Sequence, residues 1–209
     1  MEINYQDLYN MVIEDIPLSN DDVVYGISFV GLPGTGKTTI SHLLSKKLNI
    51  HVTSNDKIRR LLDSIGINSS KNQSLVERLA YNRSAYMLEN KTSMIIDADV
   101  LTTYSVVEEN FKRFNAQCFF IKLELSEQEV LRRLDEREKQ FGKEKNNYSR
   151  VTKEDYHKYI NKLKNNHFPQ NKVFYTINVE ECLDTQINLL VDKIKDYIKM
   201  DKKSSKKQF

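Results

Sequence analysis

Eight residues between an apolar run and a helical pattern have the types and spacing needed to hold a chain of phosphates. Residues 31–38 read Gly-Leu-Pro-Gly-Thr-Gly-Lys-Thr, which matches the P-loop spacing G-x-x-x-x-G-K-[ST]. Glycines keep side chains off the inner wall of such a loop, so successive backbone N–H groups can point at phosphates. The helix that follows aims its positive dipole end at the same place. We therefore predict a nucleotide phosphate site here.

The residues of this loop have separate predicted roles. We expect Lys37 to reach the β- and γ-phosphates, the Thr38 hydroxyl to ligate Mg²⁺, and Thr39 to contact the α-phosphate. The other expected nucleotide contacts are Gly31, Leu32, Pro33, Gly34, Thr35 and Gly36. The predicted cofactors are ATP and Mg²⁺, and the choice between ATP and GTP stays open. The alternative is an ordinary glycine turn, which the complete motif between a strand and a helix disfavours.

Two further stretches place charged side chains just after apolar strands. Asp56 and Arg59 lie three residues apart, on one face of a predicted helix. In the functional interpretation Asp56 accepts the proton of an acceptor hydroxyl and Arg59 orients the acceptor. In the alternative, Asp56 only favours the helix dipole and Arg59 is exposed. Asp97 ends an apolar strand, where a carboxylate can hold Mg²⁺ or its water shell, and Asp99 is expected to face the acceptor. The alternative for both is a loop carboxylate.

A cluster of arginines precedes a polar segment later in the chain. Arg133 and Arg137 are four residues apart and share a helical face, from which they could neutralise charge on a transferred phosphoryl group. The alternative is i,i+4 pairing, as between Glu129 and Arg133. Residues 142–148 are polar and suit a lid, at about 138–151, that excludes water. Arg83, on another predicted helix, is a weaker acceptor candidate.

Alternating strands and helices must position these stretches. Ser126 and Glu129 form a predicted capping box for the helix that carries the arginines. Strands are predicted at 23–30, 50–54, 92–97, 116–125 and 173–177, and helices at 2–15, after the P-loop, from 55, at 73–90, 103–114 and 126–141, from 152, and at 183–198. The alternation predicts an α/β, three-layer P-loop NTPase fold with a five-stranded parallel sheet, helices on both faces and a lid. Ligands bind beyond the carboxyl ends of such strands, where 31–38, 54–59 and 97–99 converge.

Length and composition fit one domain of this kind. The 209 residues are expected to divide into an N-terminal helical extension at 1–20, a P-loop domain at 21–199 and a disordered basic tail at 200–209. The net charge of +3 does not by itself indicate nucleic-acid binding. The two cysteines have no metal or redox spacing, which predicts reduced thiols in a cytoplasmic protein. Apolar runs are too short to predict a membrane span, and the acidic N-terminus does not resemble a signal peptide.

The order of these motifs resembles that of the small P-loop kinases. The chain carries G-L-P-G-T-G-K-T after a first strand, D-x-x-R after a second, I-I-D at the end of a third, and L-R-R-x-x-x-R before the polar segment. It looks most like the AAA-type or zeta-toxin-like group, which includes polynucleotide 5′-hydroxyl kinases and chloramphenicol phosphotransferase-like enzymes. The resemblance spans about residues 23–199, which it identifies as a kinase domain.

This resemblance implies residue roles and shows one departure. It implies that Lys37 and Thr38 bind ATP–Mg²⁺, that Asp56 is the general base and Arg59 binds the acceptor, and that Arg133 and Arg137 are lid arginines. Many relatives have D-A-T-N where this chain has Asp-Ala-Asp-Val at 97–100. The extra carboxylate is expected to repel a phosphorylated acceptor, which disfavours a nucleotide or nucleic-acid 5′ end.

Two classes of function follow. The first is an ATP-dependent phosphotransferase, a kinase moving the γ-phosphate to a hydroxyl of a small molecule or of a nucleotide or nucleic-acid substrate. A toxin-like kinase acting on a cell-wall nucleotide sugar shares this chemistry. The second is a nucleotide-binding ATPase switch acting on a protein partner. The chain lacks N-K-x-D, which disfavours a GTPase, and its short length disfavours a ring-forming ATPase. The acceptor, the oligomeric state and the role of residues 1–20 stay open.

Overall fold

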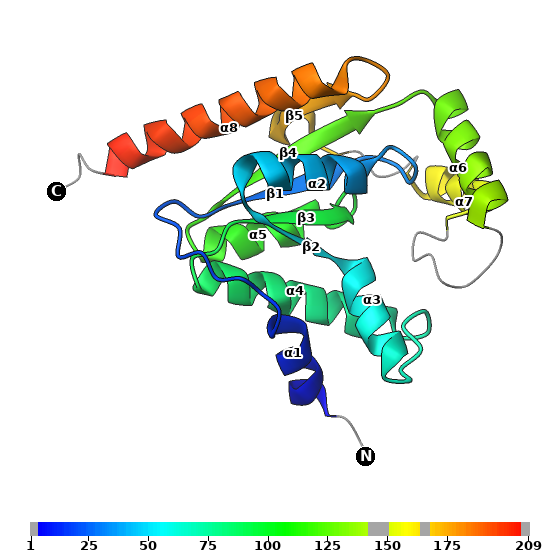
Figure 1. Ribbon diagram of the computed structural model, residues 1–209, viewed down its shortest axis with the longest axis horizontal. Coiled ribbons are helices and arrows are strands. Elements are labelled where there is room, and N and C mark those ends of the chain that lie inside the picture. The colour runs from blue at the N-terminus through cyan, green and yellow to red at the C-terminus, as the bar shows by residue number, and fades with distance from the viewer. Residues whose placement is uncertain (1–3, 142–150, 164–167, 206–209) are drawn as a thin grey trace.

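A parallel sheet of five strands forms the centre of the molecule, in the order β2-β3-β1-β4-β5 (Figure 1). The computed structural model describes residues 4–141, 151–163 and 168–205. The strands are β1 (Tyr25–Val30), β2 (His51–Ser54), β3 (Met94–Asp99), β4 (Gln117–Glu124) and β5 (Val173–Asn178). All four neighbouring pairs are parallel, which confirms the predicted sheet. The P-loop strand β1 is central, so side chains from both halves of the sheet can reach its end.

Helices cover both faces of the sheet and produce the predicted three layers. They are α1 (Tyr5–Ile13), α2 (Lys37–Leu48), α3 (Asn55–Ser64), α4 (Gln73–Glu89), α5 (Tyr104–Arg113), α6 (Glu127–Phe141), α7 (Lys153–Leu163) and α8 (Leu183–Ser205), with a short 3₁₀ turn at Gln170–Lys172. On one face Leu44 of α2 and Ile194 of α8 pack against the sheet. On the other face Met87 of α4 and Phe111 of α5 do so. These two cores hold the strand ends that carry the chemistry in fixed positions.

The N-terminal helix packs beneath α3 and α4 rather than against the sheet (Figure 1). Leu8 and Val12 lie four residues apart on its buried face, and they share a core cluster with Ile58 and Leu62 of α3 and Leu79 of α4. Asn4 caps the helix by accepting a hydrogen bond from the backbone N–H of Asp7. The segment predicted as a helical extension therefore supports the two helices beyond β2.

The C-terminal helix is longer than predicted. We expected disorder from residue 200, but α8 continues to Ser205. This part of the prediction is wrong because lysine-rich sequence without glycine or proline carries no signal that ends a helix. Met200 is 68% exposed, so this part of the helix extends beyond the core.

The predicted lid falls mostly on residues that the structure does not describe. Helix α6 includes residues 138–141, so the beginning of the expected lid is helical. Residues 142–148 lie outside the described part of the chain. Among the described residues, no helix combines the length and the apolarity needed to cross a membrane.

Candidate active site

The predicted P-loop connects the end of β1 to the start of α2. Gly34 and Gly36 have φ values of +86° and +92°, in the left-handed region that glycine tolerates best. Gly36 is the N-cap residue of α2, so the amino end of that helix opens onto the loop. A Cβ atom on Gly34 would lie 3.2 Å from Val130 of α6. The loop therefore passes close to α6, and a larger residue would push the two apart.

One cavity of about 830 Å³ brings most of the predicted site residues together. Its walls come from the P-loop, α3, the end of β3, α4, α6 and α7. Among the predicted residues it is lined by Pro33, Gly34, Gly36, Lys37, Thr38, Thr39, Asp56, Arg59, Asp97, Asp99 and Arg137. Gly31, Leu32 and Thr35 line a neighbouring cavity of about 640 Å³. A larger hollow of about 1060 Å³ lies at the amino ends of β1 and β4, away from the P-loop, so size alone does not mark the site.

The Lys37 ammonium lies inside the P-loop. Its Nζ donates to the backbone oxygens of Gly31 at 2.8 Å and Leu32 at 2.9 Å. Burial lowers the pKa of Lys37, and the nearby carboxylates of Asp99 and Asp97 oppose that effect. The loop thus concentrates positive charge and N–H donors where a polyphosphate can be held.

Thr38 and Asp97 provide an oxygen pair suited to Mg²⁺. The Thr38 hydroxyl donates to Asp97 Oδ1 at 3.3 Å. Partial burial raises the pKa of Asp97, the nearby Asp56 carboxylate raises it further, and the hydrogen bond from Thr38 opposes this. No group of three or more His, Cys, Asp or Glu side chains suited to a metal occurs in the described residues. Mg²⁺ commonly takes one or two protein ligands and completes its coordination shell with phosphates and water. Thr38 and Asp97 could supply these protein ligands.

Asp99 has partners that the sequence did not predict. It lines the cavity, but Oδ1 accepts hydrogen bonds from the backbone N–H groups of Gly31 at 3.4 Å and Leu101 at 3.2 Å. The hydroxyl of Tyr159, on α7, donates to Oδ2. Burial raises the pKa of Asp99, and Lys37 opposes this. The carboxylate therefore contacts the P-loop and α7 while it lines the cavity, and its predicted role of facing the acceptor stays a prediction.

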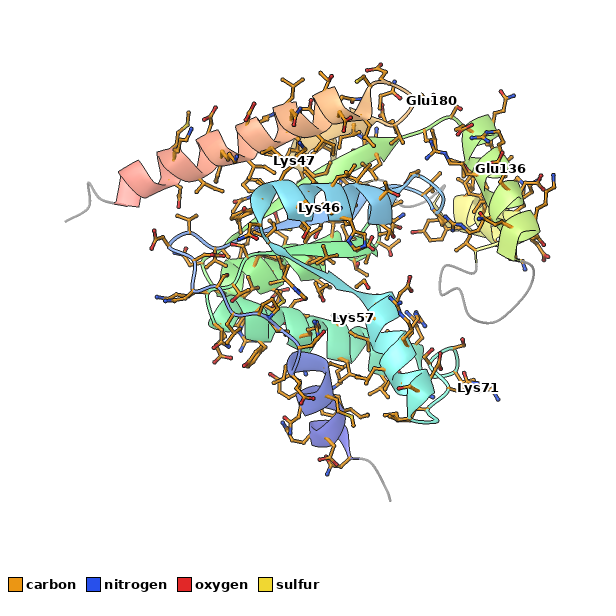
Figure 2. The ribbon with its side chains drawn as sticks, viewed as in Figure 1. Lys46, Lys47, Lys57, Lys71, Glu136 and Glu180 are labelled. Carbon is orange, nitrogen blue, oxygen red and sulfur yellow. The ribbon has the colours of Figure 1, made fainter. Side chains whose placement is uncertain are left out.

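Asp56 and Arg59 both line the cavity from the first turns of α3. Ser54 caps that helix, with its Oγ accepting from the backbone N–H of Lys57 at 3.3 Å. The guanidinium of Arg59 donates to the side-chain oxygen of Gln73, at the start of α4. Between them on α3 lies Lys57 (labelled in Figure 2), which forms an ion pair with Asp15. The helix thus presents the two predicted residues to the site and directs its lysine elsewhere.

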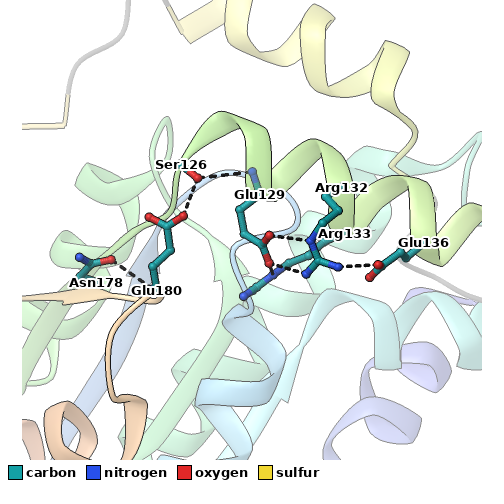
Figure 3. Close-up of polar contacts among 7 residues, drawn as sticks. All are labelled: Ser126, Glu129, Arg132, Arg133, Glu136, Asn178 and Glu180. Atoms are coloured by element: carbon teal, nitrogen blue, oxygen red, sulfur yellow. Dashed lines mark hydrogen bonds and ion pairs between the residues drawn. The ribbon is translucent and has the colours of Figure 1, made fainter.

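Arg132 and Arg133 of α6 both take part in an ion-pair network (Figure 3), and Arg133 also lies beside the P-loop. Arg132 pairs with Glu129 and Glu136, and Arg133 Nε donates to Glu129 at 2.8 Å. These arginines lower the pKa of Glu129 to about 2. Arg133 also lies beside the P-loop, with Nη1 3.7 Å from where a Cβ on Gly36 would be. The i,i+4 pair is therefore formed, and the same pair holds Arg133 near the loop.

The predicted cap of α6 is formed only on the serine side. Ser126 Oγ accepts from the backbone N–H of Glu129 at 3.4 Å and donates to Glu180 in the loop after β5 (Figure 3). The Glu129 carboxylate is directed to the two arginines instead of completing a capping box. The loop after β5 and the start of α6 are thereby joined.

Arg83 is a structural residue, so the interpretation of it as an acceptor candidate is wrong. Only 3% of its side chain is exposed. It donates to Thr53 Oγ1 at 3.2 Å and to Asp15 Oδ1 at 2.9 Å, and it contacts His51 Nε2 at 3.2 Å. It therefore ties β2 to the segment after α1. Sequence reasoning also missed Tyr159 and Gln73, which line the cavity from helices whose patterns indicated only packing.

Comparisons with known proteins agree with this fold. A family model described as an AAA domain matches residues 27–166. No curated protein matches the chain. Chaetomium thermophilum Kti12, solved with ADP-AlF3, is 16% identical with a TM-score of 0.59, over 82% of this chain and 97% of that chain. Mycobacterium tuberculosis APS kinase CysC, solved with AMPPNP and APS, is 15% identical with a TM-score of 0.57, over 84% and 99%.

A gluconokinase from Sinorhizobium meliloti 1021 is 13% identical with a TM-score of 0.54, over 86% of this chain and 97% of that chain. At these identities the likeness shows the fold. The fold is that of small P-loop kinases, which confirms the resemblance drawn from the motifs.

Proposed function

The chain belongs to the AAA domain family, and from that premise we propose that it is an ATP-dependent phosphotransferase. It would move the γ-phosphate of ATP to a hydroxyl group of a small-molecule or nucleotide-type acceptor. One observation carries the proposal: a single cavity has the P-loop, Thr38 and Asp97 on one wall and Asp56 and Arg59 on another. Such a cavity can hold a phosphate donor and an acceptor side by side. The predicted cytoplasmic location stays part of this proposal.

The donor side of the cavity suits a triphosphate. Lys37 and the backbone N–H groups at the start of α2 supply positive charge to the phosphates. Mg²⁺, held by Thr38 and Asp97, would neutralise developing charge and orient the phosphates. Arg133 and Arg137 come from α6. Their guanidinium groups would stabilise the negative charge that spreads over the transferred phosphoryl group in the transition state.

The acceptor side supplies a base and a cation. In the proposed reaction Asp56 takes the proton of the acceptor hydroxyl, whose oxygen then forms a bond to the γ-phosphorus as the bond to ADP breaks. Arg59 would bind and orient the acceptor. Asn55, Ser70 and Gln73 line the same region, and such polar walls favour a small hydrophilic acceptor over an apolar one.

Hydrogen bonds to Asp99 reduce the repulsion that its carboxylate would exert on a phosphorylated acceptor. The extra carboxylate at Asp99 was expected to repel a phosphorylated acceptor. Two backbone N–H groups and the Tyr159 hydroxyl donate to it, which offsets part of its charge. Nucleotide-type acceptors therefore remain within the proposal.

An acceptor panel tests the proposal directly. ATP consumption would be measured with nucleosides, DNA and RNA 5′ ends, sugars, sugar acids, and aminoglycoside or chloramphenicol-type antibiotics. A Lys37→Ala protein would serve as the blank. We expect one class of acceptor to raise turnover well above bare hydrolysis. Hydrolysis that no acceptor changes would favour the ATPase switch acting on a protein partner.

A substitution then tests the base. Asp56→Asn should lower kcat by about 100-fold or more while the affinity for ATP is kept, because the amide cannot take the proton. Asp192→Asn, at an exposed position of α8, is the matched control and should leave kcat unchanged. Equal turnover in the Asp56→Asn and Asp192→Asn proteins would exclude the base role.

A further inference from the structure

The carboxylate of Asp99 joins the beginning of the P-loop to a helix that lies 60 residues further along the chain. One oxygen accepts from the backbone N–H groups of Gly31 and Leu101, and the other accepts from the hydroxyl of Tyr159. Asp99 therefore links the P-loop to α7 through three hydrogen bonds.

An irregularity in β3 allows this link. Ser28 of β1 pairs with Ile96, but the next residue of β1, Phe29, pairs with Asp99. Asp97 keeps its regular pairing with Ser54 of β2. Two residues of β3 therefore bulge away from β1, and bulges re-aim the side chains around them. One strand end can thus direct Asp97 to Thr38 and Asp99 to the first residue of the P-loop.

The link also supports Lys37. Gly31 is held at both ends, because its N–H donates to Asp99 and its carbonyl oxygen accepts from Lys37 Nζ at 2.8 Å. Burial lowers the pKa of Lys37, and Asp99 is the carboxylate that opposes this effect most strongly. A change at Asp99 therefore acts on the loop conformation and on the ammonium within it.

Helix α7 is joined in turn to the helix that carries the arginines. Tyr156 of α7 packs in a buried cluster with Val130 and Leu134 of α6. Lys153 of α7 forms an ion pair with Asp135 of α6 at 2.9 Å. The two helices therefore form one unit, and whatever fixes α7 on the P-loop also fixes α6.

We propose that Tyr159 and Asp99 form a positioning pair that sets where Arg133 and Arg137 lie relative to the P-loop. The pair acts through α6 and α7 rather than by touching the transferred phosphate. Its catalytic consequence rests on the proposed function, whereas its structural consequence, the docking of α7, does not. The two can therefore be tested separately.

Hydrogen exchange of the full-length chain tests the docking. Tyr159→Phe removes the hydroxyl and keeps the ring. We expect the backbone amides of residues 153–163 to exchange at least about fivefold faster, while those of β1 and β4 keep their rates. Tyr81→Phe, at a 36% exposed tyrosine of α4, is the control. Equal exchange of α7 in the two variants would overturn the proposal.

Substitutions at Asp99 show whether the two residues act as a pair. Asp99→Ala removes every bond to the carboxylate, so adding Tyr159→Phe in that background should change α7 exchange no further. Additive effects would mean that the two side chains act independently and would overturn the pairing. Asp99→Asn keeps an oxygen for the two N–H groups and places an amide donor opposite the Tyr159 oxygen, so it should protect α7 better than Asp99→Ala. If Asp99→Ala does not fold, Tyr159→Phe decides alone.

Turnover tests the catalytic consequence. In Tyr159→Phe, kcat for ATP turnover should fall by about tenfold, because the arginines act mainly in the transition state, while Kd for AMPPNP stays within about twofold. An unchanged kcat together with faster α7 exchange would overturn the catalytic role. A wild-type protein without phosphotransfer activity would refute the proposed function, and the exchange result would still decide whether the pair docks α7.

Discussion

The hydroxyl of Thr38 donates to the carboxylate of Asp97 at 3.3 Å, although the two residues are 59 positions apart. Thr38 lies in the first turn of α2 and Asp97 near the end of β3. The fold therefore brings a hydroxyl oxygen and a carboxylate oxygen together at the edge of the sheet where the P-loop lies. This pairing gives the predicted Mg²⁺ site its geometry.

Asp97→Asn tests that site. The amide keeps the shape and loses the charge, so the Mg²⁺ concentration that supports half-maximal ATP turnover should rise about tenfold or more. A Mg²⁺ titration of turnover measures this. Binding of ATP in the presence of EDTA serves as the control and should be similar in both proteins. An unchanged Mg²⁺ requirement would show that Asp97 does not hold the ion.

Arg133 and Arg132 are neighbours on α6 that share Glu129 as an ion-pair partner, which makes them a matched pair. Arg133→Gln should lower kcat by about 10- to 1000-fold, because of these two neighbours it is Arg133 whose guanidinium lies beside the P-loop. Arg132→Gln should change kcat by no more than about twofold. The two variants are compared in the same turnover assay. Equal losses would indicate that the ion-pair network, rather than the site, is responsible.

Arg83 should contribute to stability rather than to turnover. Arg83→Met removes the donor to Thr53 and His51 and leaves Asp15 paired with Lys57 alone, and we expect the free energy of unfolding to fall by about 3 kcal/mol. Denaturant unfolding measures this. Arg78→Met is the control, because that exposed guanidinium lies 3.9 Å over the Tyr5 ring and should be worth about 1 kcal/mol or less. A loss in Arg83→Met no larger than in the control would contradict the structural role.

His51 should make stability depend on pH. Burial is the main cause of the lowered pKa of His51. The positive charges of Arg83 and Lys57 lower this pKa further, whereas the Asp15 carboxylate raises it. The folded state therefore binds a proton less readily than the unfolded state, whose histidine titrates near 6.5. The stabilisation is complete above that pH and is lost as the pH falls through the folded pKa.

Unfolding free energies measured between about pH 7 and pH 5 test this sign. His51→Gln should flatten the pH dependence in that window. Asp15 has a lowered pKa, so its own contribution is lost only at pH values below its ordinary 3.8, outside the window. A slope that the substitution leaves unchanged would assign the effect to another group.

Much of the fold was predictable because its determinants are local. Apolar runs and helical patterns marked the five strands and the helices, and the P-loop motif placed Lys37 and Thr38. Parallel pairing then implied that Asp56 and Asp97 would lie at the same edge, as they do. These inferences needed only sequence spacing and the rule that parallel strands end together.

The contacts that were missed join residues far apart in sequence. Tyr159 lies 60 residues from Asp99, and Arg83 lies 68 from Asp15, so neither pair leaves a periodic signal. The bulge in β3, which gives Asp97 and Asp99 different partners, depends on pairing with two strands at once. Such features arise from tertiary structure, and a single sequence does not reveal them.

The helices around the cavity rest on two separate hydrophobic clusters. Helix α3 and the first half of α4 pack in the cluster that includes Leu62 and α1, whereas α6 and α7 pack in the one around Leu134. Evolution can therefore modify the two sides of the site as separate modules. Substitutions in the α1 cluster can reshape the wall that carries Arg59 without moving Arg133, so a change of acceptor does not require the phosphate-binding side to be rebuilt.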